Sequence, residues 1–182
     1  FGSYEASPQQ AFASASRILA ETGAAGVKLE GGEAMADTIA FLSQRGIPVM
    51  AHIGLTPQAV NALGGYGARG KSEAEHTKIV GDARAVASAG AFAMVVEGVM
   101  EELADLITDT VAVPVIGIGA SARCDGQVLV AEDMLGMFER TPRFVKRYGA
   151  MAETISDAAA RYAADVRSRA FPTDDQVYRP KK

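Results

Sequence analysis

One stretch of strand-like sequence occurs twice in this chain. Residues 23–31 read GAAGVKLEG and residues 90–98 read GAFAMVVEG, and they align without a gap as Gly-Ala-x-x-apolar-x-apolar-Glu-Gly. The copies begin 67 residues apart, at residues 23 and 90, which is about the length of two βα units. Each copy is a short apolar run that ends in a glutamate and a glycine. We therefore expect each glutamate at the carboxyl end of a buried strand.

The rest of the chain continues the alternation of apolar runs and helical patterns. The expected strands are 26–30, 47–54, 92–98, 113–119 and 127–135. Apolar residues at helical spacing predict helices over about 8–22, 35–46, 72–88, 100–107 and 155–166. Ser7 is the expected N-cap of the first, with Pro8 at its first position and Gln10 closing a capping box.

Nearly continuous apolar strands alternating with helices are typical of a parallel sheet covered on both faces. Either a (β/α) barrel or an open doubly wound sheet fits that pattern. The repeated strand-end glutamate favours the barrel, whose polar residues gather at the carboxyl ends of the strands. Open sheets also bind ligands at that edge, so the alternative stays open at this point.

Composition indicates an ordinary globular chain. It has 182 residues, 48% of them hydrophobic and 22% charged, with a net charge of −4. The acidic balance argues against general nucleic-acid binding, and no apolar run is long enough for a membrane helix. The first ten residues, FGSYEASPQQ, lack the regions of a signal peptide. With Cys124 as the single cysteine, we expect a cytoplasmic protein. We expect a single domain over 1–182 that ends in a polar tail, 171–182.

Two opposite charges lie in the first expected strand. A period of two places Lys28 and Glu30 on one face and Val27 and Leu29 on the other. Two charges fit poorly beneath a helix, so the lumen of a barrel is the better location. The alternative is a buried ion pair with no function, which contributes little stability because desolvation is costly.

Glu97 and His52 end two further strands. Apolar neighbours surround Glu97 in the sequence, which suits a general base, although a strand-terminal glutamate can also cap the next helix. His52 precedes Ile-Gly and is a candidate for holding a substrate carboxylate or hydroxyl. A single histidine is more often a satisfied core or rim residue, so this assignment has a structural alternative.

Residues 65–72, GYGARGKS, match the phosphate-binding P-loop pattern. A P-loop must follow a strand directly, and here the nearest expected strand ends near His52. The order therefore favours a glycine-rich loop at the mouth of the barrel. Arg69 and Lys71 would then be available to anionic ligands.

Several segments together resemble the ketopantoate hydroxymethyltransferase family. They are VKLEGGE (27–33), HIGLTPQAVNALGGYGARG (52–70), VVEGV (95–99), VPVIGIGA (113–120) and CDGQVLVAEDMLG (124–136). The resemblance runs over essentially the whole chain in the right order. It implies a (β/α)₈ TIM barrel of the phosphoenolpyruvate/isocitrate-lyase group, of which this chain covers about strands four to eight and the C-terminal helices.

The resemblance also implies an activity. Family members transfer a hydroxymethyl group from 5,10-methylenetetrahydrofolate to 3-methyl-2-oxobutanoate with Mg²⁺, giving 2-dehydropantoate in pantothenate biosynthesis. Matched motif by motif, Lys28 and His52 would bind the oxo acid, Glu30 would belong to the metal site, and Glu97 would be the general base. The polarised oxo acid would lose its C3 proton to Glu97, while Mg²⁺ and Lys28 stabilised the enolate. A homo-oligomer is also implied.

The family's other two metal-binding aspartates, near the ends of the first and third strands, are not in these 182 residues. A (β/α)₈ barrel has about 250 residues. We therefore expect the N-terminal strands to be missing from this sequence or from the protein, and in the second case weak activity or none. The alternatives are a carbon–carbon lyase of the same barrel group, a P-loop-like nucleotide-binding module and a non-catalytic remnant kept for assembly.

Overall fold

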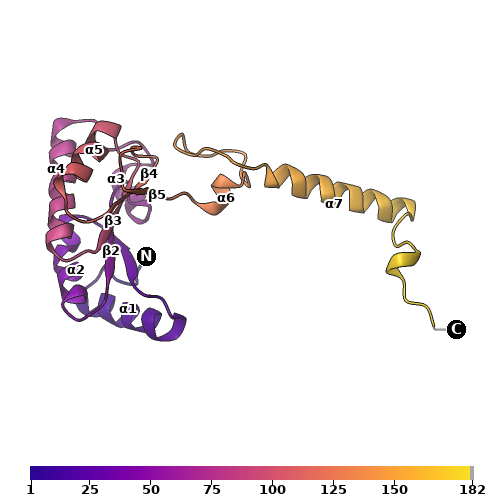
Figure 1. Ribbon diagram of the computed structural model, residues 1–182, viewed down its shortest axis with the longest axis horizontal. Coiled ribbons are helices and arrows are strands. Elements are labelled where there is room, and N and C mark those ends of the chain that lie inside the picture. Colours follow the sequence, from indigo (N-terminus) through magenta and orange to yellow (C-terminus); the bar gives the residue numbers. More distant parts are fainter. Residues whose placement is uncertain (181–182) are drawn as a thin grey trace. The chain divides into compact units, whose positions relative to one another are not determined.

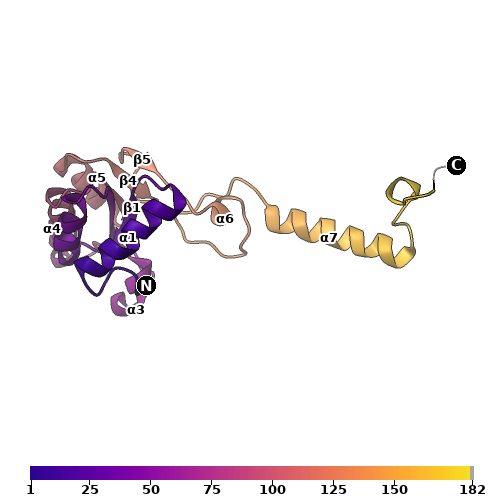
Figure 2. The same cartoon turned by 90° about the horizontal axis from the view of Figure 1, so that it is seen from below.

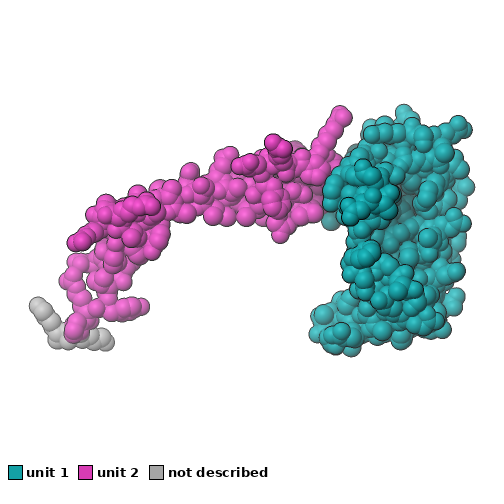
Figure 3. All heavy atoms as spheres, turned by 180° about the vertical axis from the view of Figure 1, so that it is seen from behind, with its two compact units in different colours: residues 1–128 teal, residues 129–182 magenta. Residues whose placement is uncertain are grey.

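The structure is a computed structural model that describes residues 1–180. These residues fall into two compact units, one over 1–128 and the other over 129–180 (Figure 3), and each is described here by itself. The single domain expected over 1–182 stays a prediction. No helix within residues 1–180 is both long enough and apolar enough to span a membrane.

The first unit contains a parallel sheet whose strands follow one another in chain order (Figure 1). The strands are β1 (Val27–Glu30), β2 (Val49–Gly54), β3 (Ala93–Glu97), β4 (Val115–Ile118) and β5 (Gly126–Gln127). A doubly wound sheet reverses its strand order at a switch point, and the order β1-β2-β3-β4-β5 has no reversal. The expected α/β class is confirmed, and the sheet is an arc of a (β/α) barrel.

Helices pack against one face of this sheet. They are α1 (Pro8–Thr22), α2 (Ala36–Ser43), α4 (Glu73–Ser88) and α5 (Glu101–Thr110), with short turns η1 (Glu33–Met35), η2 (Pro57–Ala59) and α3 (Val60–Leu63) between them. α4 and α5 lie side by side in both Figure 1 and Figure 2. Val49, Ala51 and Ile53 of β2 are buried in a core that also contains Ile39 of α2 and Val86 of α4. The alternate residues of β2 therefore face away from this core.

The first helix begins as its sequence predicts, with one difference. The Ser7 side chain accepts the Gln10 N–H at 3.1 Å, Pro8 occupies the first turn, and Gly23 ends the helix with a φ of 72°. The Gln10 side chain accepts the N–H of Ala6 at 3.0 Å. The expected capping box would have used the N–H of Ser7, so the reciprocal bond is displaced by one residue.

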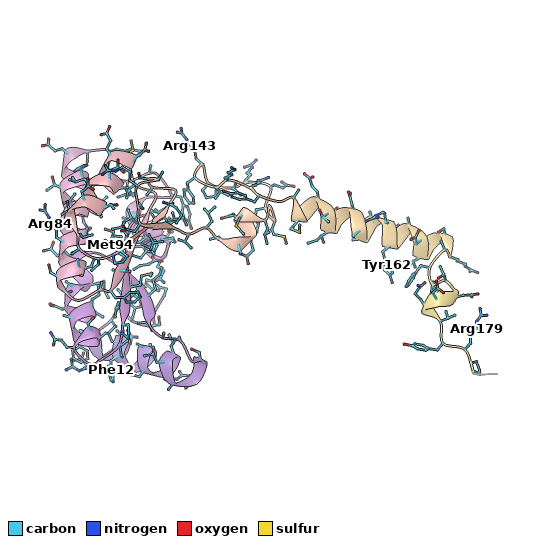
Figure 4. The ribbon with its side chains drawn as sticks, viewed as in Figure 1. Phe12, Arg84, Met94, Arg143, Tyr162 and Arg179 are labelled. Carbon is cyan, nitrogen blue, oxygen red and sulfur yellow. The ribbon has the colours of Figure 1, made fainter. Side chains whose placement is uncertain are left out.

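The second unit contains α6 (Ala131–Met134), α7 (Met151–Ser168) and the short turn η3 (Asp174–Gln176). The strand expected over 127–135 is wrong for most of its length, because β5 stops at Gln127 and α6 occupies part of the run. Glu132 and Asp133 lie in the first turn of α6, where carboxylates favour a helix. Within this unit Tyr162, labelled in Figure 4, contacts Phe171 edge-to-face at 5.4 Å between ring centroids.

Candidate active site at the carboxyl ends of β1 to β3

The register of the sheet brings the predicted site residues to one edge. Glu30 of β1 pairs with His52 of β2, and Gly54 of β2 pairs with Glu97 of β3. Because side chains alternate along a strand, Lys28 and Glu30 share one face. Leu29, between them, is buried in the core beneath the helices. The prediction that Lys28 and Glu30 face away from the helices is confirmed.

The side chains of Lys28, Glu30 and Glu97 all lie close to the imidazole of His52. The Lys28 Nζ lies 2.9 Å from His52 Nδ1, and Glu30 Oε1 lies 3.8 Å from the same nitrogen. The opposite ring nitrogen, His52 Nε2, lies 3.2 Å from Glu97 Oε2. The His52 side chain is only 4% exposed, and those of Glu30 and Glu97 are 11% and 12% exposed. Lys28 and Glu30 thus lie at one nitrogen of a buried histidine and Glu97 lies at the other, with Lys28 itself exposed to solvent.

For a charged Lys28 and a neutral His52, their contact assigns the proton of the imidazole to one nitrogen. A lysine ammonium has donors and no acceptor, so Nδ1 must accept the hydrogen bond from Lys28. The proton of a neutral imidazole then lies on Nε2. That N–H is on the side of the ring that faces Glu97. Lys28 thus orients His52 as a donor toward the Glu97 carboxylate.

The donor on Nε2 is not satisfied in this arrangement. It is buried, and despite the 3.2 Å approach of Glu97 Oε2 it has no hydrogen bond of acceptable geometry with any described residue. A buried donor without a partner costs about 1–3 kcal/mol, so such groups are rare outside functional sites. A small rotation of the Glu97 carboxylate, or a bound polar ligand, would satisfy it.

Glu30 is held from its far side. The backbone N–H of Gln58 donates to Glu30 Oε2 at 2.9 Å, which leaves Oε1 toward His52. Mg²⁺ takes about six oxygen ligands in near-octahedral geometry. Within residues 1–180 no group of three His, Cys, Asp or Glu side chains could hold a metal ion. The described residues alone do not fit a magnesium site.

The glycine-rich loop does not have the arrangement of a P-loop. No strand abuts Gly65, because η2 and α3 separate the loop from β2. The loop amides of Gly70 and Lys71 donate to Glu75 Oε2 at 2.8 and 3.2 Å. Arg69 pairs with the other oxygen of Glu75 at 2.7 Å. A carboxylate of the chain thus fills the place of an anionic ligand, and Arg69 is not available to one.

The same loop is attached to the end of β3. The Arg69 N–H donates to the Gly98 carbonyl at 2.8 Å, and the Met100 N–H donates to the Arg69 carbonyl at 3.0 Å. Sequence reasoning missed this contact, and it also missed Tyr4 and Gln58 beside Glu30. Gln58 lies in the HIGLTPQ segment that carries the resemblance, whereas Tyr4 has no sequence signal because it contacts β1 only through the tertiary fold.

Known proteins of one family match this chain along nearly its whole length. A sequence profile described as ketopantoate hydroxymethyltransferase matches residues 1–174. The 3-methyl-2-oxobutanoate hydroxymethyltransferase of Novosphingobium aromaticivorans is 74% identical over 181 residues. Proteins of the same name from Erythrobacter litoralis and Sphingopyxis alaskensis are each 68% identical, over 181 and 178 residues.

The matches cover 98–100% of this chain and 62–63% of those relatives. The chain thus spans a little under two thirds of the length of the proteins it resembles. The profile match and the identities extend over the strands that carry Lys28, Glu30, His52 and Glu97. The chain therefore belongs to the ketopantoate hydroxymethyltransferase family.

Proposed function

We propose that the protein containing this chain transfers a hydroxymethyl group from 5,10-methylenetetrahydrofolate to 3-methyl-2-oxobutanoate, giving 2-dehydropantoate for pantothenate biosynthesis. The observation that carries the proposal is the line of contacts from Lys28 through His52 to Glu97 at the carboxyl end of the sheet. It places a cation and a candidate base on opposite sides of one imidazole. The similar proteins are named for their action on 3-methyl-2-oxobutanoate, which makes this oxo acid the candidate substrate.

In the proposed reaction Glu97 removes the proton from C3 of the oxo acid. The electrons of the C3–H bond form the C2–C3 double bond of an enolate, and negative charge develops on the C2 oxygen. The Lys28 ammonium would stabilise that oxygen, since a positive charge held in place by His52 acts on the negative charge that develops there. His52 would hold Glu97 through its Nε2–H and hold the substrate near both groups.

The enolate carbon then attacks the one-carbon unit of the folate. Water first releases that unit as formaldehyde: both of its bonds to folate nitrogens break, and the two nitrogens take the two protons of the water while its oxygen stays on the carbon. The enolate carbon then forms the new carbon–carbon bond, the electron pair of the carbonyl π bond moves to the formaldehyde oxygen, and that oxygen takes the proton held by Glu97 to become the hydroxyl of the product. No described residue is assigned to the folate, so its site stays outside this proposal.

Mg²⁺ belongs to the proposal only in part. Glu30 would offer Oε1, the oxygen that Gln58 does not occupy, as one ligand. The remaining ligands would come from residues outside this chain or from water. A metal held there would supply Lewis-acid chemistry, and no step of the proposed reaction is assigned to it. The homo-oligomer and the cytoplasmic location stay predictions.

The test uses the full-length protein that contains this chain. Turnover is measured with both substrates, and deuterium exchange at C3 of 3-methyl-2-oxobutanoate is followed by NMR. Glu97→Gln should lower both rates at least about 100-fold, because it removes the base and keeps the shape. Glu101→Gln is the matched control, since Glu101 is exposed in the first turn of α5. Unchanged exchange in Glu97→Gln would refute the assignment of the base.

The same experiment separates the alternatives. Exchange at C3 without formation of 2-dehydropantoate would favour a carbon–carbon lyase of the same barrel group. Neither exchange nor transfer by the full-length protein would favour a non-catalytic role and would overturn the proposed function. Nucleotide binding is not expected, because Glu75 occupies the amides that a phosphate would need.

A further inference from the structure

On the edge of β1 that faces away from β2, the Tyr4 side chain meets a backbone amide. The amides of Val27 and Gly31 donate to carbonyls beside or within β2, at 3.0 and 2.9 Å. Successive amides of a strand point to opposite edges, so the amide of Glu30, just before Gly31, points away from β2. It donates to the Tyr4 hydroxyl oxygen at 3.0 Å. A side chain from the segment before α1 thus takes up a backbone donor of the residue that ends β1.

The Tyr4 hydroxyl is also a donor, and it has two acceptors within reach. Gln58 Oε1 lies 2.6 Å away and the Glu30 carbonyl lies 3.4 Å away. A phenol has one hydrogen, and the shorter contact takes it. Tyr4 therefore holds the Gln58 side chain. The backbone N–H of Gln58 in turn donates to Glu30 Oε2 at 2.9 Å.

These bonds close a ring from Glu30 through Tyr4 and Gln58 back to Glu30. The ring includes the backbone amide of Glu30 and also its carboxylate, so it holds both the backbone and the end of the side chain of this residue. A free glutamate loses considerable rotamer entropy when it is held in one orientation, and a ring of hydrogen bonds supplies that restraint before any ligand binds. The oxygen left over is Oε1, the one nearest His52.

We propose that Tyr4 and Gln58 are positioning residues that hold the Glu30 carboxylate with Oε1 directed toward the Lys28, His52 and Glu97 side of the site. Neither residue touches the reacting groups in this proposal, and both act through Glu30. The inference rests on the proposed role of Glu30 in the reaction. The ring itself joins three segments that are 26 and 28 residues apart in sequence.

A double-mutant cycle on the full-length protein tests whether Tyr4 acts through Glu30. Tyr4→Phe removes one oxygen and keeps the ring, and we expect kcat to fall about 5- to 10-fold while stability changes little. In the Glu30→Gln background the same substitution should lower kcat less than 2-fold. Equal losses in both backgrounds would overturn the proposal. Loss of activity in Tyr4→Phe with no effect of Glu30→Gln would instead refute the role of Glu30.

Amide hydrogen exchange keeps the proposal testable even if the parent protein shows no turnover. Tyr4→Phe should speed exchange of both the Glu30 and the Gln58 amide about fivefold, because the ring opens at both. Gln58→Leu, which removes the acceptor of the phenol, should reproduce the change at Glu30. Tyr178→Phe is the matched control, since Tyr178 is fully exposed. An unchanged Gln58 amide in Tyr4→Phe would overturn the proposal.

Discussion

Gly54→Ala tests how closely β2 and β3 approach at the edge that carries Glu97. Gly54 has a φ of 87°, and a Cβ there would lie 2.5 Å from the Glu97 carbonyl oxygen and 2.7 Å from Val99 Cγ1. The carbonyl cannot move away freely, because it accepts the Leu55 N–H at 2.8 Å. The new methyl group must therefore push the backbone of Glu97 itself.

Two costs add at Gly54. An alanine in the left-handed region costs about 1 kcal/mol, and a forced close contact in a packed region costs about 2 kcal/mol. Gly46→Ala separates them, because Gly46 has a φ of 82° and a Cβ there meets nothing within 4 Å. The gain from a stiffer unfolded chain is the same in both variants and cancels. We expect Gly54→Ala to lower the free energy of unfolding by about 2 kcal/mol more than Gly46→Ala does.

The assay is urea unfolding of the full-length protein at one protein concentration, followed by far-ultraviolet circular dichroism. Turnover should also fall in Gly54→Ala and not in Gly46→Ala, because only Gly54 lies against Glu97. Losses of unfolding free energy that agree within about 0.5 kcal/mol would refute the close approach of the two strands.

Three further predictions concern single side chains. Gly32→Ala would place a Cβ 2.1 Å from the buried Asp82 carboxylate and should lower the unfolding free energy by about 2 kcal/mol. Gly67→Ala, which meets nothing within 4 Å, should not; equal effects in urea unfolding would contradict the contact. Met94→Ala empties a fully buried position (labelled in Figure 4) and should cost about 3 kcal/mol in the same assay, whereas Met94→Leu should cost less than about 1.5 kcal/mol. Burial, with the Glu30 charge adding to it, raises the pKa of the Tyr4 phenol, so the folded state keeps a proton that the unfolded state loses. Unfolding free energy should therefore fall as pH rises above about 10, and the fall should be shallower in Tyr4→Phe.

The strands were largely predictable because they are nearly continuous apolar runs. Parallel strands covered by helices need such runs, and β1 to β4 each lie within an expected range. The strand predicted over 127–135 was wrong because apolar residues in a short segment also suit a helical turn, and Glu132 and Asp133 favour the start of one. In so short a run, the acidic residues at the start of the turn favour helix over strand, and the pattern of apolar residues does not distinguish the two.

The site was predictable at the level of faces and strand ends. A period of two was enough to place Lys28 with Glu30, and the repeated motif was enough to match Glu97 with Glu30 at strand ends. Neither pattern gives the register between neighbouring strands. The pairing of Glu30 with His52, and of Gly54 with Glu97, comes from the packed sheet.

The sequence by itself determined which apolar strands carry charged residues. It also determined which charged residues share a face of their strand, since alternation is a property of one strand. Only the tertiary structure decided what those charges meet. Lys28 orients His52, Glu75 neutralises Arg69, and Tyr4 with Gln58 holds Glu30. In each case packing and loop closure bring the two groups together. A hydrogen bond forms only when donor and acceptor are about 3 Å apart and aligned, and the spacing of residues along the chain does not determine that.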